Sequence, residues 1–412
     1  MIIYNFIFII LFPLIFLRNI YKSFKFRENF SRNLEKLSVF SRNIQRPKKI
    51  ILIHAVSVGE VLASRKFVEE VQNKFPDHKI LMTCSTQTGS ETINRVYGDS
   101  VLHQYLPFDV RFFIKRFIDF WQPEHTFIVE TEIWPNLIDL LNKNGKKVYL
   151  VNGRMSEKSF KRYKSVLPLF KDVFSKFDFI ICQGADDLKR FVDLGVNKTK
   201  IKEDFSFKFD SIETGHEKNS SIKNSKKDFK VIICASTHDP EEEILIKTFY
   251  KINTDKTILI LVPRHPERAQ NIYNKHIQTN KNISLFSKDN FTIDFSKKII
   301  LVDKIGYLEN LFSLADIAFI GGSLIPHGGQ NFLEAVKFSL PVSSGKSIYN
   351  FQQIAEDLMK ISILQIGNSP EELSLIWQKQ LEERSEKIKN SSREYLNFRK
   401  GASKRALDIL PL

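Results

Sequence analysis

The chain has 412 residues, a formal net charge of +15 at pH 7 and 42% hydrophobic residues. This length predicts two or three domains, and the ordinary apolar content excludes a membrane protein with many spans. The three cysteines, Cys84, Cys182 and Cys234, form no Cys-x-x-Cys pair, which argues against a zinc knuckle or a disulfide framework and favours a reducing compartment.

An apolar run fills residues 1–17 and is interrupted by Asn5 and Pro13. No positive segment precedes it and no small-residue cleavage site follows it, so a cleaved signal peptide is not expected. A helix over this run reaches roughly 24 Å, against a bilayer hydrocarbon core of ~30 Å. We therefore predict that residues 1–21 are a membrane anchor. It either spans the bilayer with snorkelling from Arg18 and Lys22 or lies half-inserted.

A basic segment follows the apolar run. Residues 18–49 hold ten Lys or Arg residues against two acidic ones, which gives +8 of the net charge. Basic residues beside an anchor favour the cytoplasmic side and anionic lipid headgroups. Phenylalanines are interleaved with them, but no nucleic-acid-binding motif is present. Residues 22–49 are predicted to be a membrane-proximal segment that contacts anionic lipids and no nucleic acid.

From residue 50 onward, strand-like and helical patterns alternate, as is typical of parallel sheets with helices on both faces. The first set of expected strands is 50–53, 80–83, 126–129, 147–151 and 179–182. A polar stretch at 211–229 is predicted to be a linker. The second set is 231–234, 258–262, 298–302, 317–320 and 341–343. We predict two doubly wound domains at 50–210 and 230–370, with a ligand cleft between them, and a C-terminal helical segment at 371–412.

Glu60 stands where the loop after the first expected strand meets a helix, which is predicted from the apolar spacing of Val61, Val68, Val71 and Phe75. Open α/β sheets bind ligands at the carboxyl ends of their strands. A helix N-terminus favours an ionised carboxylate, so Glu60 is expected to be charged and able to accept a proton. The alternative is an acidic residue that only complements the helix dipole.

Two more segments of the first domain follow strands. Residues 83–91 are rich in hydroxyls, and an N-cap with a capping box explains much of this pattern. Glu130 and Glu132 come at the end of an apolar strand and point to one side of an extended chain. Trp134 and Pro135 come next. A functional role for one of the two carboxylates is therefore a hypothesis.

The second domain carries two candidate ligand segments. Arg264 and His265 follow a buried strand and suit an anionic ligand. Residues 321–336 contain two Gly-Gly pairs and lead into a helix expected near Asn331, whose N–H groups would face a phosphate. Glu334 is placed to accept hydrogen bonds from ribose hydroxyls. The segment is neither a dinucleotide fingerprint nor a P-loop, and the histidines of the chain lack metal-site spacing, so no metal is expected.

Ordered sequence strings run through nearly the whole chain. They are His-Ala-Val-Ser-Val-Gly-Glu at 54–60, Thr-Gly-Ser-Glu at 88–91, Glu-Thr-Glu-Ile-Trp-Pro-Asn-Leu at 130–137, Asn-Gly-Arg-Met-Ser at 152–156, Phe-Lys-Phe-Asp at 207–210, Ser-Thr-His at 236–238, Pro-Arg-His-Pro-Glu-Arg at 263–268, Gly-Gly-Ser-Leu at 321–324 and Gly-Gly-Gln-Asn-Phe-Leu-Glu at 328–334. Together they resemble the 3-deoxy-D-manno-octulosonic acid (Kdo) transferases. The resemblance implies an α/β glycosyltransferase B fold, with two Rossmann-like domains facing a cleft and an N-terminal anchor helix.

The resemblance also implies an activity. It is the inverting transfer of Kdo from CMP-Kdo to a phosphorylated lipid A precursor, in lipopolysaccharide biosynthesis at the cytoplasmic face of the inner membrane. No cofactor beyond this donor substrate is implied. The glutamate matching Glu60 is the family's general base, and the residues matching Glu130 and Lys208 assist the transition state. CMP contacts would fall on Arg264, His265, Ile305, Gly306, Tyr307, Asn331, Phe332, Leu333 and Glu334.

The chain departs from the family pattern at a few positions. The family usually has His and Pro where Gln330 and Phe332 stand, commonly Glu at Tyr307, and Gly at Phe205. Two alternatives therefore remain open. One is an enzyme of the same fold that uses a UDP- or GDP-linked sugar, and the other is a catalytically inactive, membrane-tethered binding protein.

Overall fold

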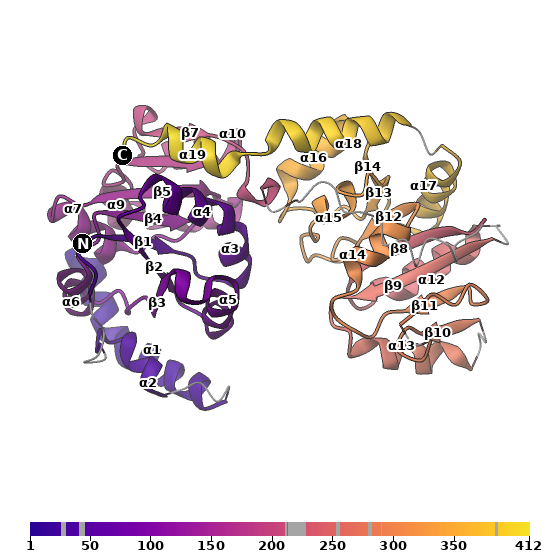
Figure 1. Cartoon of the computed structure of the whole chain (residues 1–412), viewed down its shortest axis with the longest axis horizontal. Helices are drawn as coiled ribbons and strands as arrows, with labels where there is room; N and C mark the ends of the chain where they lie inside the picture. Colours follow the sequence, from indigo (N-terminus) through magenta and orange to yellow (C-terminus); the bar gives the residue numbers. More distant parts are fainter. Residues whose placement is uncertain are drawn as a thin grey trace. The chain divides into compact units, whose positions relative to one another are not determined.

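The computed structural model describes residues 1–25, 30–40, 46–210, 212, 228–252, 256–278, 282–289, 291–383 and 386–412. The chain forms two compact units (Figure 1). Unit 1 comprises Met1–Ser211 and Arg399–Leu412, and unit 2 comprises Ile212–Phe398. Most of the predicted linker at 211–229 lies outside the described residues.

Unit 1 is built on a parallel sheet of seven described strands in the order β3-β2-β1-β4-β5-β6-β7. The strands are β1 Ile50–His54, β2 Lys79–Cys84, β3 Leu102–Tyr105, β4 His125–Val129, β5 Lys147–Gly153, β6 Phe179–Cys182 and β7 Ile201–Glu203. Its helices are α1 Ile2–Lys25, α2 Phe30–Glu35, α3 Val58–Ala63, α4 Arg65–Lys74, α5 Gln87–Tyr97, α6 Arg111–Trp121, α7 Pro135–Lys143, α8 Glu157–Ser165, α9 Leu167–Phe174, α10 Ala185–Asp193 and α19 Ala402–Ile409.

Helices cover both faces of this sheet, which explains why its strands are apolar throughout. Ile50 and Leu52 of β1 pack into one core cluster, whereas Ile51 and Ile53 pack into another. Successive side chains of a strand point to opposite faces, so each cluster fills one side of the sheet. Helix α19 packs beside α4 on the second face (Figure 1), and the chain thus returns to unit 1 at its end.

The strand order reverses between β1 and β4, which are hydrogen-bonded neighbours. Ligands bind to open α/β sheets outside the carboxyl ends of the strands at such a reversal. The loop after β1 leads to Glu60 and the loop after β4 begins at Glu130. The topology therefore brings the two predicted carboxylate segments to one edge of the sheet.

Unit 2 holds a second parallel sheet of seven described strands in the order β10-β11-β9-β8-β12-β13-β14. The strands are β8 Lys230–Thr237, β9 Thr257–Pro263, β10 Ile283–Leu285, β11 Ile299–Leu301, β12 Ile317–Ile320, β13 Val342–Ser344 and β14 Leu364–Ile366. Its helices are α12 Glu241–Lys251, α13 Arg268–Ile277, α14 Leu308–Leu314, α15 Leu333–Val336, α16 Gln352–Lys360, α17 Pro370–Glu382 and α18 Glu386–Arg399. Here the order reverses between β8 and β12.

Every strand expected from the sequence is present, with ends shifted by a few residues. The strands β3, β7, β10 and β14 were not predicted, and each has three or four residues. The helix expected after residue 59 is two helices, because the chain bends at Ser64 between α3 and α4. Doubly wound α/β architecture in both units confirms the predicted fold class.

Helix α1 lies along unit 1. The Tyr4 hydroxyl donates to Asp109 at 2.8 Å near one end, and Asn19 donates to Asn33 at 3.0 Å near the other. Between them, the ring of Phe12 packs against Phe108 and Phe113. The opposite face of the helix is exposed and apolar, with Ile2, Ile3, Phe6, Ile9, Ile10, Leu14 and Leu17. By length and composition alone, Ile2–Tyr21 is long and apolar enough to cross a membrane.

Candidate active site

Glu60 lies in the first turn of α3, where its carboxylate is held by the loop before the helix. The Val56 amide donates to Oε2 at 2.6 Å, and the Ser57 hydroxyl donates to Oε1 at 2.9 Å. Ser57 is also the N-cap of α3 and accepts from the Glu60 amide. Only 9% of Glu60 is exposed. The carboxylate is therefore fixed in one orientation at the carboxyl edge of the sheet.

The charge state of Glu60 is not set mainly by the helix terminus, as the sequence suggested. Burial and the nearby charge of Glu130 raise its pKa above the ordinary value, and the hydrogen bonds from Val56 and Ser57 only partly oppose this. A raised pKa makes the carboxylate a stronger base once it is ionised. Glu60 therefore has the electrostatics of a proton acceptor rather than of a simple helix-dipole partner.

The loop between β4 and α7 brings two more carboxylates to the same edge. Glu130 has a positive φ of 61°, which is a strained conformation for a residue with a side chain. Burial, together with the charges of Glu60 and Glu130, raises the pKa of Glu132 to about 7. Such mutual influence shows that the three carboxylates form one electrostatic cluster.

Lys208 supplies a positive charge to this cluster. Burial lowers its pKa, while Glu130 opposes the shift. Its segment is held by Asn152 at the end of β5, whose side-chain oxygen accepts from the Phe207 amide at 3.0 Å. Asn152 also has a positive φ, of 54°. Glu130 thus interacts electrostatically with both Glu60 and Lys208, which come from segments that are far apart in the sequence.

The hydroxyl-rich turn before α5 braces the Glu60 loop. Thr86 is the N-cap of α5, and its hydroxyl donates to the Val56 carbonyl at 2.9 Å. Gly89 is needed at this contact, because a Cβ there would lie 2.9 Å from the same carbonyl. The predicted N-cap is therefore Thr86, which also supports Val56, the residue whose amide bonds Glu60. The predicted capping box is wrong, because Gly89 stands at the third helical position and has no side chain to return a hydrogen bond.

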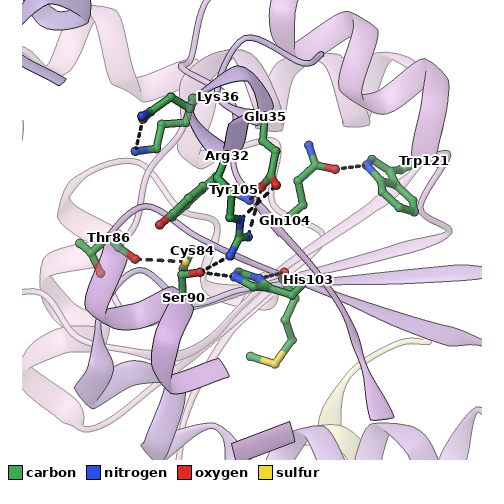
Figure 2. Close-up of polar contacts among 12 residues, drawn as sticks. Arg32, Glu35, Lys36, Cys84, Thr86, Ser90, His103, Gln104, Tyr105 and Trp121 are labelled. Carbon is green, nitrogen blue, oxygen red and sulfur yellow. Dashed lines mark hydrogen bonds and ion pairs between the residues drawn. The ribbon is translucent and has the colours of Figure 1, made fainter. Parts of the chain in front are cut away.

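A polar network joins α2 to the start of α5 (Figure 2). Arg32 donates to the Ser90 hydroxyl at 2.6 Å and pairs with Glu35. The His103 Nδ1 atom lies 3.0 Å from the Met82 carbonyl, which can only accept, so Nδ1 carries the proton. Burial lowers the pKa of His103 to about 4, so Nε2 is free of a proton and accepts from Ser90 at 2.8 Å. Helix α2 is thereby hydrogen-bonded to the start of α5, and through Ser90 to His103 of β3.

The predicted CMP residues all belong to unit 2 and fall into two groups. Arg264, His265, Ile305 and Glu334 are exposed, although His265 lies 3.7 Å from Glu267 and Glu334 accepts from the Asn331 side chain at 3.3 Å. Tyr307 is stacked on Phe291, with ring centroids 5.4 Å apart. Gly306 before it has a φ of 99°, which favours glycine. Phe332 and Leu333, by contrast, are core side chains with at most 1% exposure, so only their backbone remains available to a nucleotide.

The helix expected near Asn331 is a single turn, α15, and starts at Leu333. Phe332 is its N-cap, and the Asn331 side-chain oxygen accepts from the Leu333 amide at 3.2 Å. This uses one of the N–H groups that the sequence suggested for phosphate. A one-turn helix has a weak dipole, so Arg264 becomes the more important candidate for charge on the ligand.

Glu241 is a residue of this site that the sequence did not reveal. It is fully buried at the start of α12, and its carboxylate accepts four backbone N–H groups. Three of them belong to Gly322, Ser323 and Leu324, and the fourth to His238. Glu241 therefore joins the loop after β8 to the Gly-rich loop after β12, at the point where the strand order reverses.

Three histidines meet beside the Gly-rich loop. The His238 ring lies 4.3 Å from His327 and 6.1 Å from His265, measured between centroids. Gln330 approaches His238 Nε2 at 3.2 Å. Within the described part of the chain, no group of three or more His, Cys, Asp or Glu residues is arranged to hold a metal ion. That no metal is involved stays a prediction.

Comparison with known proteins adds independent information. The family model described as 3-Deoxy-D-manno-octulosonic-acid transferase (kdotransferase) matches residues 28–211. A 3-deoxy-D-manno-octulosonic acid transferase of Haemophilus influenzae is 35% identical over 398 residues, covering 94% of this chain and 92% of that protein. The corresponding protein of Rickettsia bellii is 30% identical and covers 96% and 94%. The chain belongs to the Kdo transferase family.

Solved structures agree on the fold. A glycosyltransferase of Rickettsia africae aligns with a TM-score of 0.60 at 12% identity, over 88% of this chain and 97% of that one. The Anabaena protein HepE, solved with UDP-glucose, gives a TM-score of 0.58 at 12% identity, over 87% and 98%. The family and the two doubly wound sheets make this chain a glycosyltransferase of the B fold. The predicted cleft between the two domains stays a prediction.

Proposed function

We propose that this Kdo transferase moves Kdo from CMP-Kdo to a phosphorylated lipid A precursor, with inversion and with Glu60 as the general base. The observation that carries the proposal is the cluster at the strand-order reversal of unit 1. There an oriented, buried carboxylate of raised pKa lies in the field of Glu130, and Lys208 is coupled to the same Glu130. An acidic residue that only complemented the helix dipole would not need a second carboxylate and a buried lysine nearby.

The reaction is a single displacement. Glu60 takes the proton from a sugar hydroxyl of the acceptor while the oxygen forms a bond to the anomeric carbon of Kdo. The bond from that carbon to the CMP phosphate oxygen breaks, and CMP leaves with the electron pair. A general base of this kind contributes ~10²–10⁴-fold to the rate. Lys208 would stabilise negative charge on the donor, whose carboxylate needs a cationic partner.

We assign CMP to unit 2. Arg264 is exposed directly after β9 and can grip the phosphate in two hydrogen bonds, and His265 is exposed beside it. Glu334 on α15 would accept from the ribose hydroxyls, and the backbone around Gly306 and Asn331 would approach the base and the phosphate. Glu241 supports this arrangement by holding the Gly-rich loop in place.

We also propose that α1 attaches the enzyme to the cytoplasmic surface of the inner membrane and lies in the plane of that surface. Tyr4 and Asn19, near opposite ends of the helix, both bond to unit 1. A helix that crossed the bilayer would have its two ends on opposite sides, so one of these contacts would be broken. The exposed apolar face would enter the lipid, and Arg18 would meet anionic headgroups.

The decisive experiment is product formation from CMP-Kdo and lipid A precursor by the purified full chain in detergent. Glu60→Gln should lower turnover by ~10²–10⁴-fold, because the amide can no longer take a proton. The amide oxygen still accepts from Val56 and the amide N–H₂ can donate to Ser57, so the variant should fold and bind CMP. Near-normal turnover by Glu60→Gln would refute the assignment. Stronger thermal stabilisation by UDP or GDP than by CMP would favour another donor.

A further inference from the structure

The start of α7 is capped by a residue that is distant in the sequence. Trp134 occupies the N-cap position but makes no side-chain cap, and Pro135 is the first helical residue. Instead, Asp109 accepts from the Asn136 amide at 2.9 Å and from the Leu137 amide at 3.1 Å. Asp109 is fully buried. It therefore fixes the point at which the carboxylate loop, residues 130–134, enters its helix.

Helix α1 completes this cap. The Tyr4 hydroxyl donates to Asp109 Oδ2 at 2.8 Å, on the same oxygen that accepts from the Asn136 amide. The Asn136 side chain in turn donates to Asn5 at 2.7 Å and to the Asp109 carbonyl at 2.6 Å. Asp109, Asn136, Tyr4 and Asn5 thus form one connected unit, which we call the clasp.

The clasp holds the carboxylate loop at the end where the loop joins α7. At its other end, the loop is held by β4 and by the Glu130 amide, which donates to the Val151 carbonyl at 3.0 Å. Glu130 sits at a positive φ of 61°, a conformation that persists only where the surroundings impose it. Loosening the α7 end would let Glu130 relax and would move the charge that raises the pKa of Glu60.

We propose that Tyr4 and Asn5 are positioning residues of the active site, which act through Asp109 and Asn136 to hold the loop that carries Glu130 and Glu132. The anchor helix is then part of the catalytic architecture and cannot be removed without disturbing it. Seating of α1 at the membrane and correct geometry of the carboxylate loop are coupled through these four side chains. The inference rests on the proposed function for the role of the loop, but not for the existence of the coupling.

The test compares Tyr4→Phe with Tyr149→Phe in the full chain in detergent micelles. Tyr149 is a matched control, because it is in the same unit and its hydroxyl donates to the Pro411 carbonyl at 2.7 Å rather than to a residue of the clasp. Hydrogen exchange of the segment 130–137 should be faster by about tenfold in Tyr4→Phe and unchanged in Tyr149→Phe, as loss of one bond to a carboxylate implies. This readout needs no substrate and thus remains informative if the proposed function fails.

Steady-state kinetics distinguish a positioning role of Tyr4 from a role of α1 in membrane attachment alone. In micelles, the enzyme and the acceptor are already together, so a helix that only anchors would leave the rate unchanged. We expect kcat to fall about tenfold in Tyr4→Phe with an unchanged KM for CMP-Kdo. In an Asp109→Ala background, which leaves no side-chain acceptor for the Tyr4 hydroxyl, Tyr4→Phe should cause little further loss. Equal exchange in the two tyrosine variants, an unchanged kcat, or fully additive losses with Asp109→Ala would each overturn the proposal.

Discussion

Ser57 and Glu60 bond to each other in both directions: the Ser57 oxygen accepts from the Glu60 amide, and the Ser57 hydroxyl donates to the Glu60 carboxylate at 2.9 Å. A residue that usually only caps a helix therefore also aims the proposed base. The same hydroxyl favours the ionised form of Glu60 and so lowers its pKa. The Ser57 side chain therefore contributes both to the stability of α3 and to the orientation of the proposed base.

Ser57→Ala should have two measurable effects. Loss of the N-cap should destabilise unit 1 by about 1 kcal/mol. Loss of the hydrogen bond should raise the pKa of Glu60 further, so the acidic limb of the pH–rate profile should move to higher pH. Ser57→Thr keeps the hydroxyl and serves as the control. An unchanged acidic limb in Ser57→Ala would show that this hydroxyl does not tune the base.

Glu132→Gln should change how stability depends on pH. The folded-state pKa of Glu132 is about 7, above its ordinary value of 4.5, so the folded chain retains this proton as pH rises. The stability linked to the proton is complete below pH ~4.5 and is lost as pH rises through ~7. The variant should match the wild type near pH 4.5 and exceed it near pH 8 by up to about 3 kcal/mol. Denaturant unfolding at several pH values measures this, and a difference independent of pH would contradict it.

Glu241→Ala should abolish the binding of CMP to unit 2. It removes the acceptor for four buried N–H groups, including those of Gly322 and Ser323. Each unsatisfied group costs ~1–3 kcal/mol, so unit 2 should be strongly destabilised and CMP binding lost. Glu243→Gln is the control, because Glu243 is on the same helix and makes partly exposed pairs with Lys275 and His276 but accepts from none of these loop amides. Calorimetric titration with CMP distinguishes the two variants, and retained affinity in Glu241→Ala would refute the role.

Asp210→Ala should loosen α19 from the rest of unit 1. Asp210 accepts from the Gly401, Ala402 and Ser403 amides and so caps α19. Removing it should cost ~1–2 kcal/mol, and Asp210→Asn should cost less because one oxygen still accepts. Lys208 lies two residues away, so kcat should also fall. Limited proteolysis near residue 400 measures the release of α19, and equal resistance in all three proteins would count against this cap.

The sequence alone predicted the fold class and the central strands of both sheets. Apolar runs such as 50–53 and 317–320 fixed the parallel strands, because a strand buried on both faces must be apolar throughout. The strands β3, β7, β10 and β14 escaped detection because they are the edge strands of the two sheets, and polar residues such as Gln104, Lys202 and Gln365 interrupt their apolar runs. Glu60 and Glu130 were predicted from the residues to lie where strands end, and the structure places them there, whereas Lys208 was named only through the family resemblance. The catalytic roles of all three stay a proposal.

Only the tertiary structure decided the properties that depend on distant neighbours. Burial and Glu130 raise the pKa of Glu60, against the effect expected from its own helix end. Glu241 reaches Gly322 across 81 residues of sequence, and Tyr4 reaches Asp109 across 105. No local pattern records such contacts, since a buried carboxylate is identified by the donors that surround it and those donors converge only when the chain folds.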